Sequence, residues 1–283
     1  MPNKMLAVCW VVFLVLALLF GLSGCSSEAT AQEISSKTIN AMATLHTDRY
    51  TQTLQIVLEV TGGIKPGNLT MSGRTTGSEN LVSQEAQTTN DVRVEMTGVA
   101  SKLDVSHDTY FVGGWMYMKA VGYPWYKEKL PEDTWASESQ IGQQTESLKR
   151  VHNLTRLDDE NIDGVDCYVL QATPELNSAI ELGVVQELDT YFGSNISVSS
   201  VDWGNVVKYL SVRKWISKNE HLVVKLSYDL SIEILPQDLG NTTIDMTRIN
   251  VNATGQTNYY DYNKPVVIQL PPDAQSATEL PLQ

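Results

Sequence analysis

The chain contains little cysteine: three residues in 283, at Cys9, Cys25 and Cys167. Cys9 lies inside the apolar N-terminal segment and Cys25 directly follows it, which leaves only Cys167 in the remaining sequence. An intramolecular disulfide is therefore excluded, and the fold must be held by a core large enough to need no covalent link. Cys167 lies in an apolar, strand-like run, Val165–Leu170, which predicts a buried small side chain.

Positive charge is also scarce. The chain has 20 Lys and Arg residues against 33 Asp and Glu residues, so its formal net charge is −13. Removal of the first 24 residues would take away Lys4 and no acidic residue, giving 19 − 33 = −14. Nucleic-acid binding requires a basic surface, so that class of partner is excluded. Attraction to anionic lipid headgroups through charge is disfavoured for the same reason.

Catalytic and metal-binding signatures are missing. The sequence has no Gly-x-Ser-x-Gly elbow, His-Glu-x-x-His helix or glycine-rich phosphate loop. The four histidines have no ligand spacing: His46, His107, His152 and His221. Residues 159–164 fit the first half of a calcium-binding loop, but Leu170 occupies the position where a bidentate glutamate is required. We expect no metal, no cofactor and no enzymatic activity.

The N-terminus carries the strongest signal in the chain. Lys4 precedes an uncharged apolar run, Met5–Phe20, which is followed by Leu22-Ser23-Gly24-Cys25. A charged start, an apolar centre and a small-residue cleavage site are typical of a secretory signal. The last four residues resemble the lipobox of bacterial lipoproteins, which implies cleavage before Cys25 and a diacylglyceryl thioether on its sulfur, with palmitate-type acyl chains. The alternative is an uncleaved membrane helix, for which about 20 apolar residues are needed. Both interpretations place the rest of the chain outside the cytoplasm.

The remaining sequence divides simply. We expect a lipoprotein signal peptide over residues 1–24, a lipidated tether over 25–32, one folded domain over 33–273 and a loose C-terminal tail over 274–283. About 255 residues suit one large β-rich domain or two small ones.

Strands with alternating polarity dominate the domain. The clearest is Leu222–Ile234, where every second residue is apolar and the residues between are polar. Thirteen residues at about 3.4 Å each give a strand about 40 Å long, which is typical of a large curved sheet. Helical spacing predicts helices over residues 33–46, 132–151 and 175–191.

These elements predict the α+β class: a large curved antiparallel sheet of nine to eleven strands that forms an incomplete barrel, with about three helices covering its open concave side. So few helices would not fill the hollow of such a sheet, and an apolar space would remain in which a lipophilic ligand could bind. The alternative is a hollow packed with side chains. The residues expected to line the cavity are Leu54, Ile56, Leu58, Val60, Val94, Met96, Trp115, Tyr117, Ile180, Val184, Leu226 and Leu230.

Several short segments resemble one known superfamily. They are, in order, Tyr117–Lys119, Trp125–Lys127, Ile162–Leu170, Trp215–Lys218, His221–Val224, Tyr259–Ile268 and Pro271-Pro272. Their order and sequence are similar to those of LolA-like proteins, in particular lipoproteins of the LppX and LprG kind. The resemblance implies an antiparallel half-barrel of about eleven strands that carries lipids, acylated proteins or glycolipids. Residues 193–204 depart from the pattern.

The sequence thus predicts a monomeric lipoprotein at the extracytoplasmic face of the cell membrane, held there through its N-terminal lipid anchor. Its half-barrel would bind a lipid or glycolipid for carriage or presentation. The alternative is a sensor or assembly factor that binds a protein partner at the cell envelope and carries no lipid.

Overall fold

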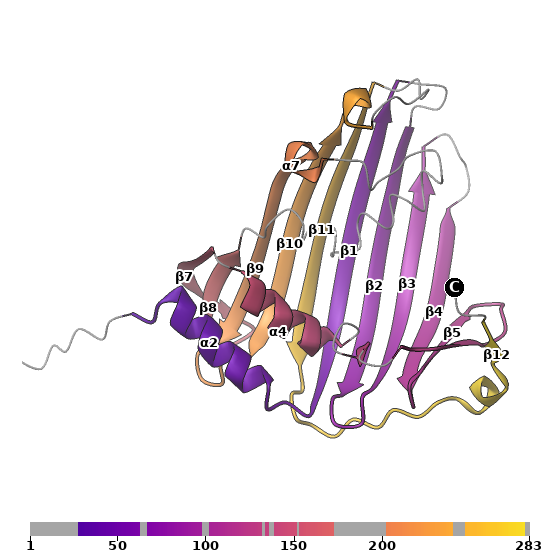
Figure 1. The fold of residues 1–283 in the computed structure, drawn as a ribbon, viewed down its shortest axis with the longest axis horizontal. Helices are drawn as coiled ribbons and strands as arrows, with labels where there is room; N and C mark the ends of the chain where they lie inside the picture. Colours follow the sequence, from indigo (N-terminus) through magenta and orange to yellow (C-terminus); the bar gives the residue numbers. More distant parts are fainter. Residues whose placement is uncertain are drawn as a thin grey trace, which may run out of the picture. The chain divides into compact units, whose positions relative to one another are not determined.

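Twelve strands form one sheet in the order β12-β6-β5-β4-β3-β2-β1-β11-β10-β9-β8-β7 (Figure 1). Their bounds are β1 Thr47–Thr61, β2 Gly67–Asn80, β3 Glu85–Met96, β4 Leu103–Val112, β5 Trp115–Ala120, β6 Tyr126–Lys129, β7 Leu154–Ile162, β8 Val165–Ala172, β9 Val207–Ser217, β10 Val223–Ile234, β11 Arg248–Tyr260 and β12 Thr278–Glu279. The computed structural model describes residues 28–62, 67–97, 102–131, 134–135, 139–151, 153–172, 202–239 and 247–280.

The sheet is curved and open. Neighbouring strands pair antiparallel, except that the short β12 runs parallel to β6. The two end strands, β12 and β7, do not pair with each other, so the sheet does not close into a barrel. The predicted α+β half-barrel is confirmed, with twelve strands where the sequence predicted about eleven.

Side-chain alternation gives the sheet one apolar and one polar face. Leu54, Ile56 and Leu58 on β1 point to the face that we call the inner face, and Thr53 and Gln55 point to the outer face. The strand predicted at 222–234 is β10, whose buried residues Leu226, Leu230, Ile232 and Ile234 share the inner face. The register transmits this division from strand to strand, because directly paired residues lie on the same face.

Three α-helices fall within the described ranges: α2 (Ala31–Met42), α4 (Gln140–Arg150) and α7 (Trp203–Val206). The prediction of helices near 33–46 and 132–151 is confirmed by α2 and α4, with shorter bounds. Ser139 begins α4, since its hydroxyl accepts a hydrogen bond from the Gly142 amide at 3.1 Å and satisfies a helix donor. The helix predicted over 175–191 lies outside the described residues, as does most of 193–204.

The β4–β5 hairpin has a two-residue turn made of two glycines. Gly113 and Gly114 have φ angles of 62° and 77°. Both angles lie in the left-handed region that a tight hairpin turn requires and that glycine adopts without steric cost. A side chain at either position would strain the backbone, although its Cβ would have no heavy atom within 4 Å.

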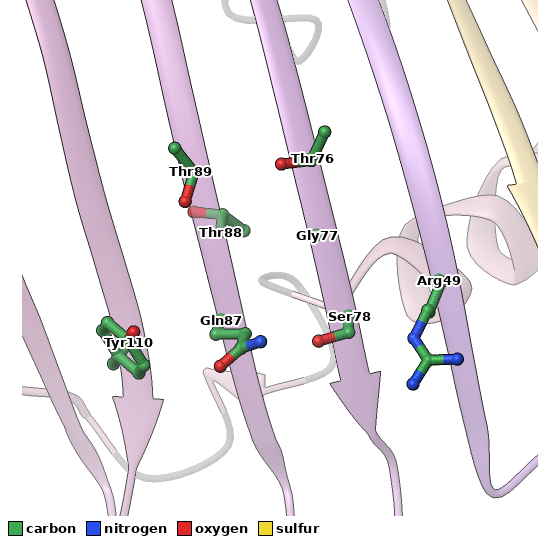
Figure 2. A pocket seen from close by; sticks show the side chains of 8 residues that line it. All are labelled: Arg49, Thr76, Gly77, Ser78, Gln87, Thr88, Thr89 and Tyr110. Atoms are coloured by element: carbon green, nitrogen blue, oxygen red, sulfur yellow. The ribbon is translucent and has the colours of Figure 1, made fainter. Parts of the chain in front are cut away.

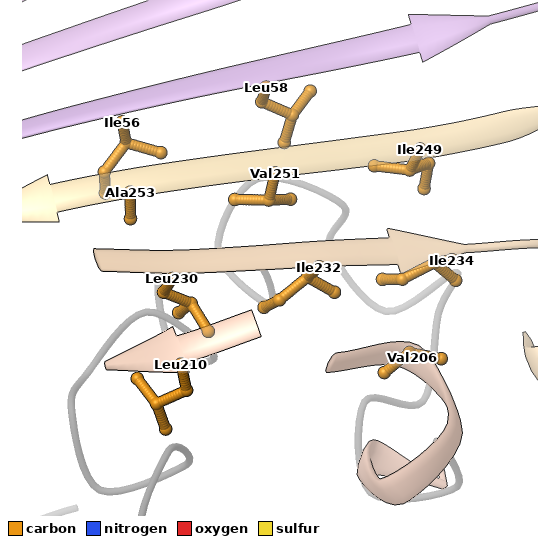
Figure 3. Close-up of a cluster of buried hydrophobic side chains, with 10 residues drawn as sticks. All are labelled: Ile56, Leu58, Val206, Leu210, Leu230, Ile232, Ile234, Ile249, Val251 and Ala253. Carbon is orange, nitrogen blue, oxygen red and sulfur yellow. The ribbon is translucent and has the colours of Figure 1, made fainter. Parts of the chain in front are cut away.

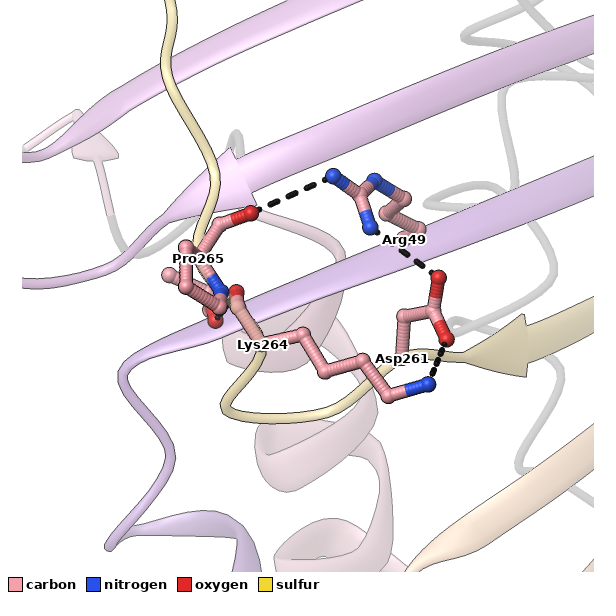
Figure 4. Close-up of polar contacts among 5 residues, drawn as sticks. Arg49, Asp261, Lys264 and Pro265 are labelled. Atoms are coloured by element: carbon pink, nitrogen blue, oxygen red, sulfur yellow. Dashed lines mark hydrogen bonds and ion pairs between the residues drawn. The ribbon is translucent and has the colours of Figure 1, made fainter.

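The C-terminal segment runs from the end of β11 to the far edge of the sheet. Its start is fastened on the outer face, where Arg49 donates to Asp261 at 3.0 Å and to the Pro265 carbonyl at 3.2 Å (Figure 4). At its end a short helix, η4 (Pro272–Ser276), is joined by the ion pair of Lys119 with Asp273 at 2.7 Å. The sequence predicted a loose tail from residue 274, but η4 and β12 order the chain as far as residue 280 because β12 adds to the edge of the sheet.

Cys167 is fully buried and packs with Val169 and Trp215 near the β7 edge, as predicted for a small apolar side chain. Burial raises the pKa of its thiol, which makes the thiolate unfavourable. Among the described helices none is both long and apolar enough to cross a membrane.

Candidate functional site

An apolar row crosses the inner face at right angles to the strands. The paired positions, from β9 to β4, are Leu210, Leu230, Ala253, Ile56, Met71, Val94 and Leu103. A second row beside it contains Ile232, Val251, Leu58, Leu69 and Met96. Seven adjacent strands, from β9 to β4 in the sheet, thus contribute side chains to one continuous apolar surface.

The residues of these rows are buried on β9–β11 and β1 and become more exposed from β2 to β4. On β9–β11 and β1 the side chains form a packed cluster, with Leu230 at 1% and Ile56 at 6% exposure (Figure 3). Met71 on β2 and Val94 on β3 are half-buried. Leu103 on β4 is 59% exposed. The apolar surface therefore continues beyond the packed core into an accessible region.

The inner face becomes polar toward the other end of the strands. Gln52, Thr75 and Asn90 lie side by side next to the apolar rows, and Thr75 donates to Asn90 at 2.7 Å. Beyond them, Asp48 and Glu79 are direct cross-strand neighbours, and both are fully buried. The inner face is thus amphiphilic along the strand direction.

Helix α4 packs on this polar end. The Glu79 carboxylate accepts hydrogen bonds from the Gln140 amide at 2.8 Å and the Ser139 hydroxyl at 3.0 Å. Burial raises the pKa of Glu79, while these donors act in the opposite direction. The pKa of Asp48 is raised to about 8, mainly by burial and to a smaller extent by the negative charge of Glu79.

A buried cation contacts the same helix further along. Lys214 of β9 is 3% exposed, and its ammonium donates to the Gln144 side-chain oxygen at 2.6 Å and to the Ser147 hydroxyl at 2.5 Å. Burial lowers the pKa of Lys214 to about 7. Helix α4 therefore contacts the sheet through one buried acid and one buried base, each hydrogen-bonded.

The structure brings most of the predicted cavity residues together. The residues on the inner face are Leu54, Ile56, Leu58, Val60, Val94, Met96, Leu226 and Leu230. Trp115 and Tyr117 lie on the opposite, outer face, because Tyr117 pairs with Tyr110 and through it with Gln87, Ser78 and Arg49. Trp115 there lies under the ammonium of Lys127, 4.6 Å from the ring centre. Ile180, Val184 and Cys25 lie outside the described residues.

The outer face carries a shallow polar depression of about 220 Å³ (Figure 2). Its lining comes from four adjacent strands: Arg49, Thr76, Gly77, Ser78, Gln87, Thr88, Thr89 and Tyr110. Hydroxyl and amide groups dominate it, and Arg49 is already paired with Asp261. Within the described ranges no group of three or more His, Cys, Asp or Glu side chains is arranged to hold a metal ion.

Sequence reasoning missed the buried charges. Asp48 is in phase with Ile56, so the alternation of β1 already placed its carboxylate on the apolar face. Lys214 is likewise in phase with Leu210. Glu79 had no such signal, because the Thr-, Ser- and Gly-rich β2 does not alternate clearly.

No family model matches the sequence, and no curated protein matches it. Among solved structures, the chain is similar to lipoprotein LppX of Mycobacterium tuberculosis, with 16% identity, 84% of this chain and 98% of that chain covered, and a TM-score of 0.40. LprF of Mycobacterium bovis is 16% identical, with 85% of this chain and 96% of that chain covered and a TM-score of 0.43. A putative outer membrane lipoprotein-sorting protein domain of Vibrio parahaemolyticus is 10% identical, with 83% of this chain and 93% of that chain covered and a TM-score of 0.22. LppX is one of the lipoproteins that the sequence motifs resemble.

Proposed function

We propose that the inner face binds the hydrocarbon part of an amphiphile, and that the protein carries or presents this ligand at the extracytoplasmic face of the membrane. Cys25 would supply the membrane anchor through its acyl chains. The ligand would be a lipid or an acylated molecule, and the protein would act without a covalent step.

One observation carries this proposal: the apolar rows extend past the packed core onto strands where they are half-buried or exposed. Leu69, Met71 and Val94 are apolar and only partly covered, and Met96 is 41% exposed. Each methylene group removed from water contributes about 0.8 kcal/mol. An acyl chain lying along these rows would therefore bind favourably without any rearrangement of the sheet.

The test is binding of a fluorescent fatty acid to the delipidated protein, with Val94→Asp as the probing variant. Val94 is half-buried near the β4 end of the first apolar row. A carboxylate there would disfavour contact with hydrocarbon, and loss of one such apolar contact, about 1.5–3 kcal/mol, corresponds to roughly tenfold or more in affinity.

The matched control is Val57→Asp, since Val57 is half-buried on the outer face of β1. This variant should bind the fatty acid as the wild type does. Equal weakening in both variants, or no binding by the wild-type chain, would contradict the proposed function. Mass spectrometry of the gently purified protein gives a second measurement, because a co-purifying lipid supports carriage, whereas an empty protein favours a protein partner.

A further inference from the structure

The attachment of α4 to the sheet rests on two neighbouring acids. Asp48 and Glu79 are paired across β1 and β2, with exposures of 0% and 1%. Like charges directly opposite each other on a sheet are destabilising, and burial magnifies the repulsion. Two carboxylates in these positions cannot both be ionised without loss of stability.

Hydrogen bonding assigns different roles to the two acids. Glu79 accepts from the Gln140 amide and the Ser139 hydroxyl, so its negative charge is held by the N-terminus of α4. Both oxygens of Asp48 are buried, and among the described residues neither has a hydrogen-bond partner. A buried carboxylate without donors is strongly disfavoured in its ionised form, so Asp48 holds the proton.

Among the described residues, the groups that face this pair provide no compensating positive charge. Tyr50, Tyr259 and Tyr262 surround it, and burial is the main cause that raises the pKa of each, so all three stay neutral. The contacting residues of α4 are the uncharged Ser139 and Gln140. Lys214, the buried cation of the inner face, is hydrogen-bonded to Gln144 and Ser147 of α4.

We propose that a proton on Asp48 fastens α4 to the inner face: the helix N-terminus docks on the Asp48–Glu79 pair when the pair carries a single negative charge. Acid therefore tightens the docking of α4, and alkali loosens it. Loosening would uncover the side chains beneath the helix, among them Tyr259, whose hydroxyl contacts Gln140 at 3.4 Å. Docking by this proton does not depend on what the inner face binds.

The direction and range of the effect follow from linkage. In the docked form the pKa of Asp48 is raised from 3.8 to about 8, mainly by burial and to a smaller extent by the negative charge of Glu79. In a detached, solvated form the carboxyl would return toward its ordinary value. Detachment therefore releases a proton between these two pH values, and its equilibrium constant rises by up to about tenfold per pH unit in that range. The contribution of the Asp48 proton to docking is therefore largest on the acid side of this range, and above the upper value it is lost.

The test is hydrogen exchange of the α4 amides, measured by mass spectrometry from pH 3.8 to about 8 and corrected for the intrinsic pH dependence of exchange. In the wild-type chain the protection of α4 should fall progressively as the pH rises. In Asp48→Asn, which imitates the protonated acid, the protection of α4 should fall much less over this range, because Asp48 no longer titrates. The matched control is Asp229→Asn, the same change at an exposed residue of the outer face, which should keep the wild-type slope.

A wild-type slope of zero, or an equal slope in Asp48→Asn, would overturn the proposal. If Asp48→Asn does not fold, NMR titration of the Asp48 carboxyl carbon in the wild-type chain decides the question. A midpoint near 8 supports the proton-held helix, and a midpoint near the ordinary 3.8 rules it out.

Discussion

Two glycines of the inner face make room for tyrosine rings. A Cβ at Gly77 would lie 2.3 Å from the Tyr50 ring, and one at Gly255 would lie 2.3 Å from the Tyr228 ring. Real carbon atoms do not approach so closely, so a methyl group at either position must displace an aromatic ring. The small residues of β2 and β11 are thus part of the packing and not breaks in the strands.

Gly77→Ala should destabilise the protein by about 1–3 kcal/mol, the usual cost of forcing an extra methyl group into a packed site. Gly73→Ala is the matched control on the same strand and face, because its added Cβ would have no neighbour nearer than 3.9 Å. Urea unfolding of both variants measures the difference. Equal stability of the two would show that the Tyr50 ring moves aside freely.

At the same scale, residue type alone was a poor guide to the buried acids. Aspartate is usually a solvent-facing residue, although the position of Asp48 in the alternation of β1 placed it on the inner face. Its partner Glu79 became visible only when the register of β1 and β2 was known. Pairing across strands is a tertiary property, which a single segment of sequence does not contain.

Among the elements, α4 depends on buried charge of both signs. Asp48 destabilises the docked helix as the pH rises toward 8, whereas Lys214 acts in the opposite direction and over a higher range. Burial lowers the pKa of Lys214 from 10.5 to about 7, so the folded protein loses this proton before the unfolded chain does. The free energy of unfolding therefore gains from Lys214 as the pH rises from about 7 to 10.5 and gains nothing from it below that range.

Lys214→Met should remove this gain. Chemical denaturation at a series of pH values should show a smaller rise in unfolding free energy between pH 7 and 10.5 than in the wild type. Lys208→Met, at an exposed lysine of the same strand, should retain the full rise. An unchanged rise in Lys214→Met would show that folding does not lower the pKa of Lys214.

Strands differed in how well their faces could be predicted. In β10 apolar and polar residues alternate, and the predicted inner residues Leu226 and Leu230 are confirmed on one face with Ile232. In β5 the sequence Trp-Met-Tyr-Met is apolar on both sides, so alternation could not tell which side carries Trp115. The register with β4 decides it, and places the aromatic rings outside and the methionines inside.

For the whole molecule, attachment to the membrane is predicted to depend on one atom, the Cys25 sulfur. Two or more acyl chains hold a protein at a bilayer durably, whereas one chain holds it only marginally. Cys25→Ser should therefore move the protein from the membrane fraction to the soluble fraction, as cell fractionation would show. Ser26→Ala is the matched control and should leave the protein in the membrane fraction. Retention of Cys25→Ser in membranes would point to an uncleaved apolar helix as the anchor.

The position of β1 in the middle of the sheet also has a consequence for synthesis. β1 is the first of the described strands, but one of its two partners, β11, begins only at Arg248. During synthesis one edge of β1 therefore stays unpaired until β11 has been made. An incomplete product that stops before Arg248 would leave the backbone N–H and C=O groups along that edge unpaired, and such an edge is a template for aggregation.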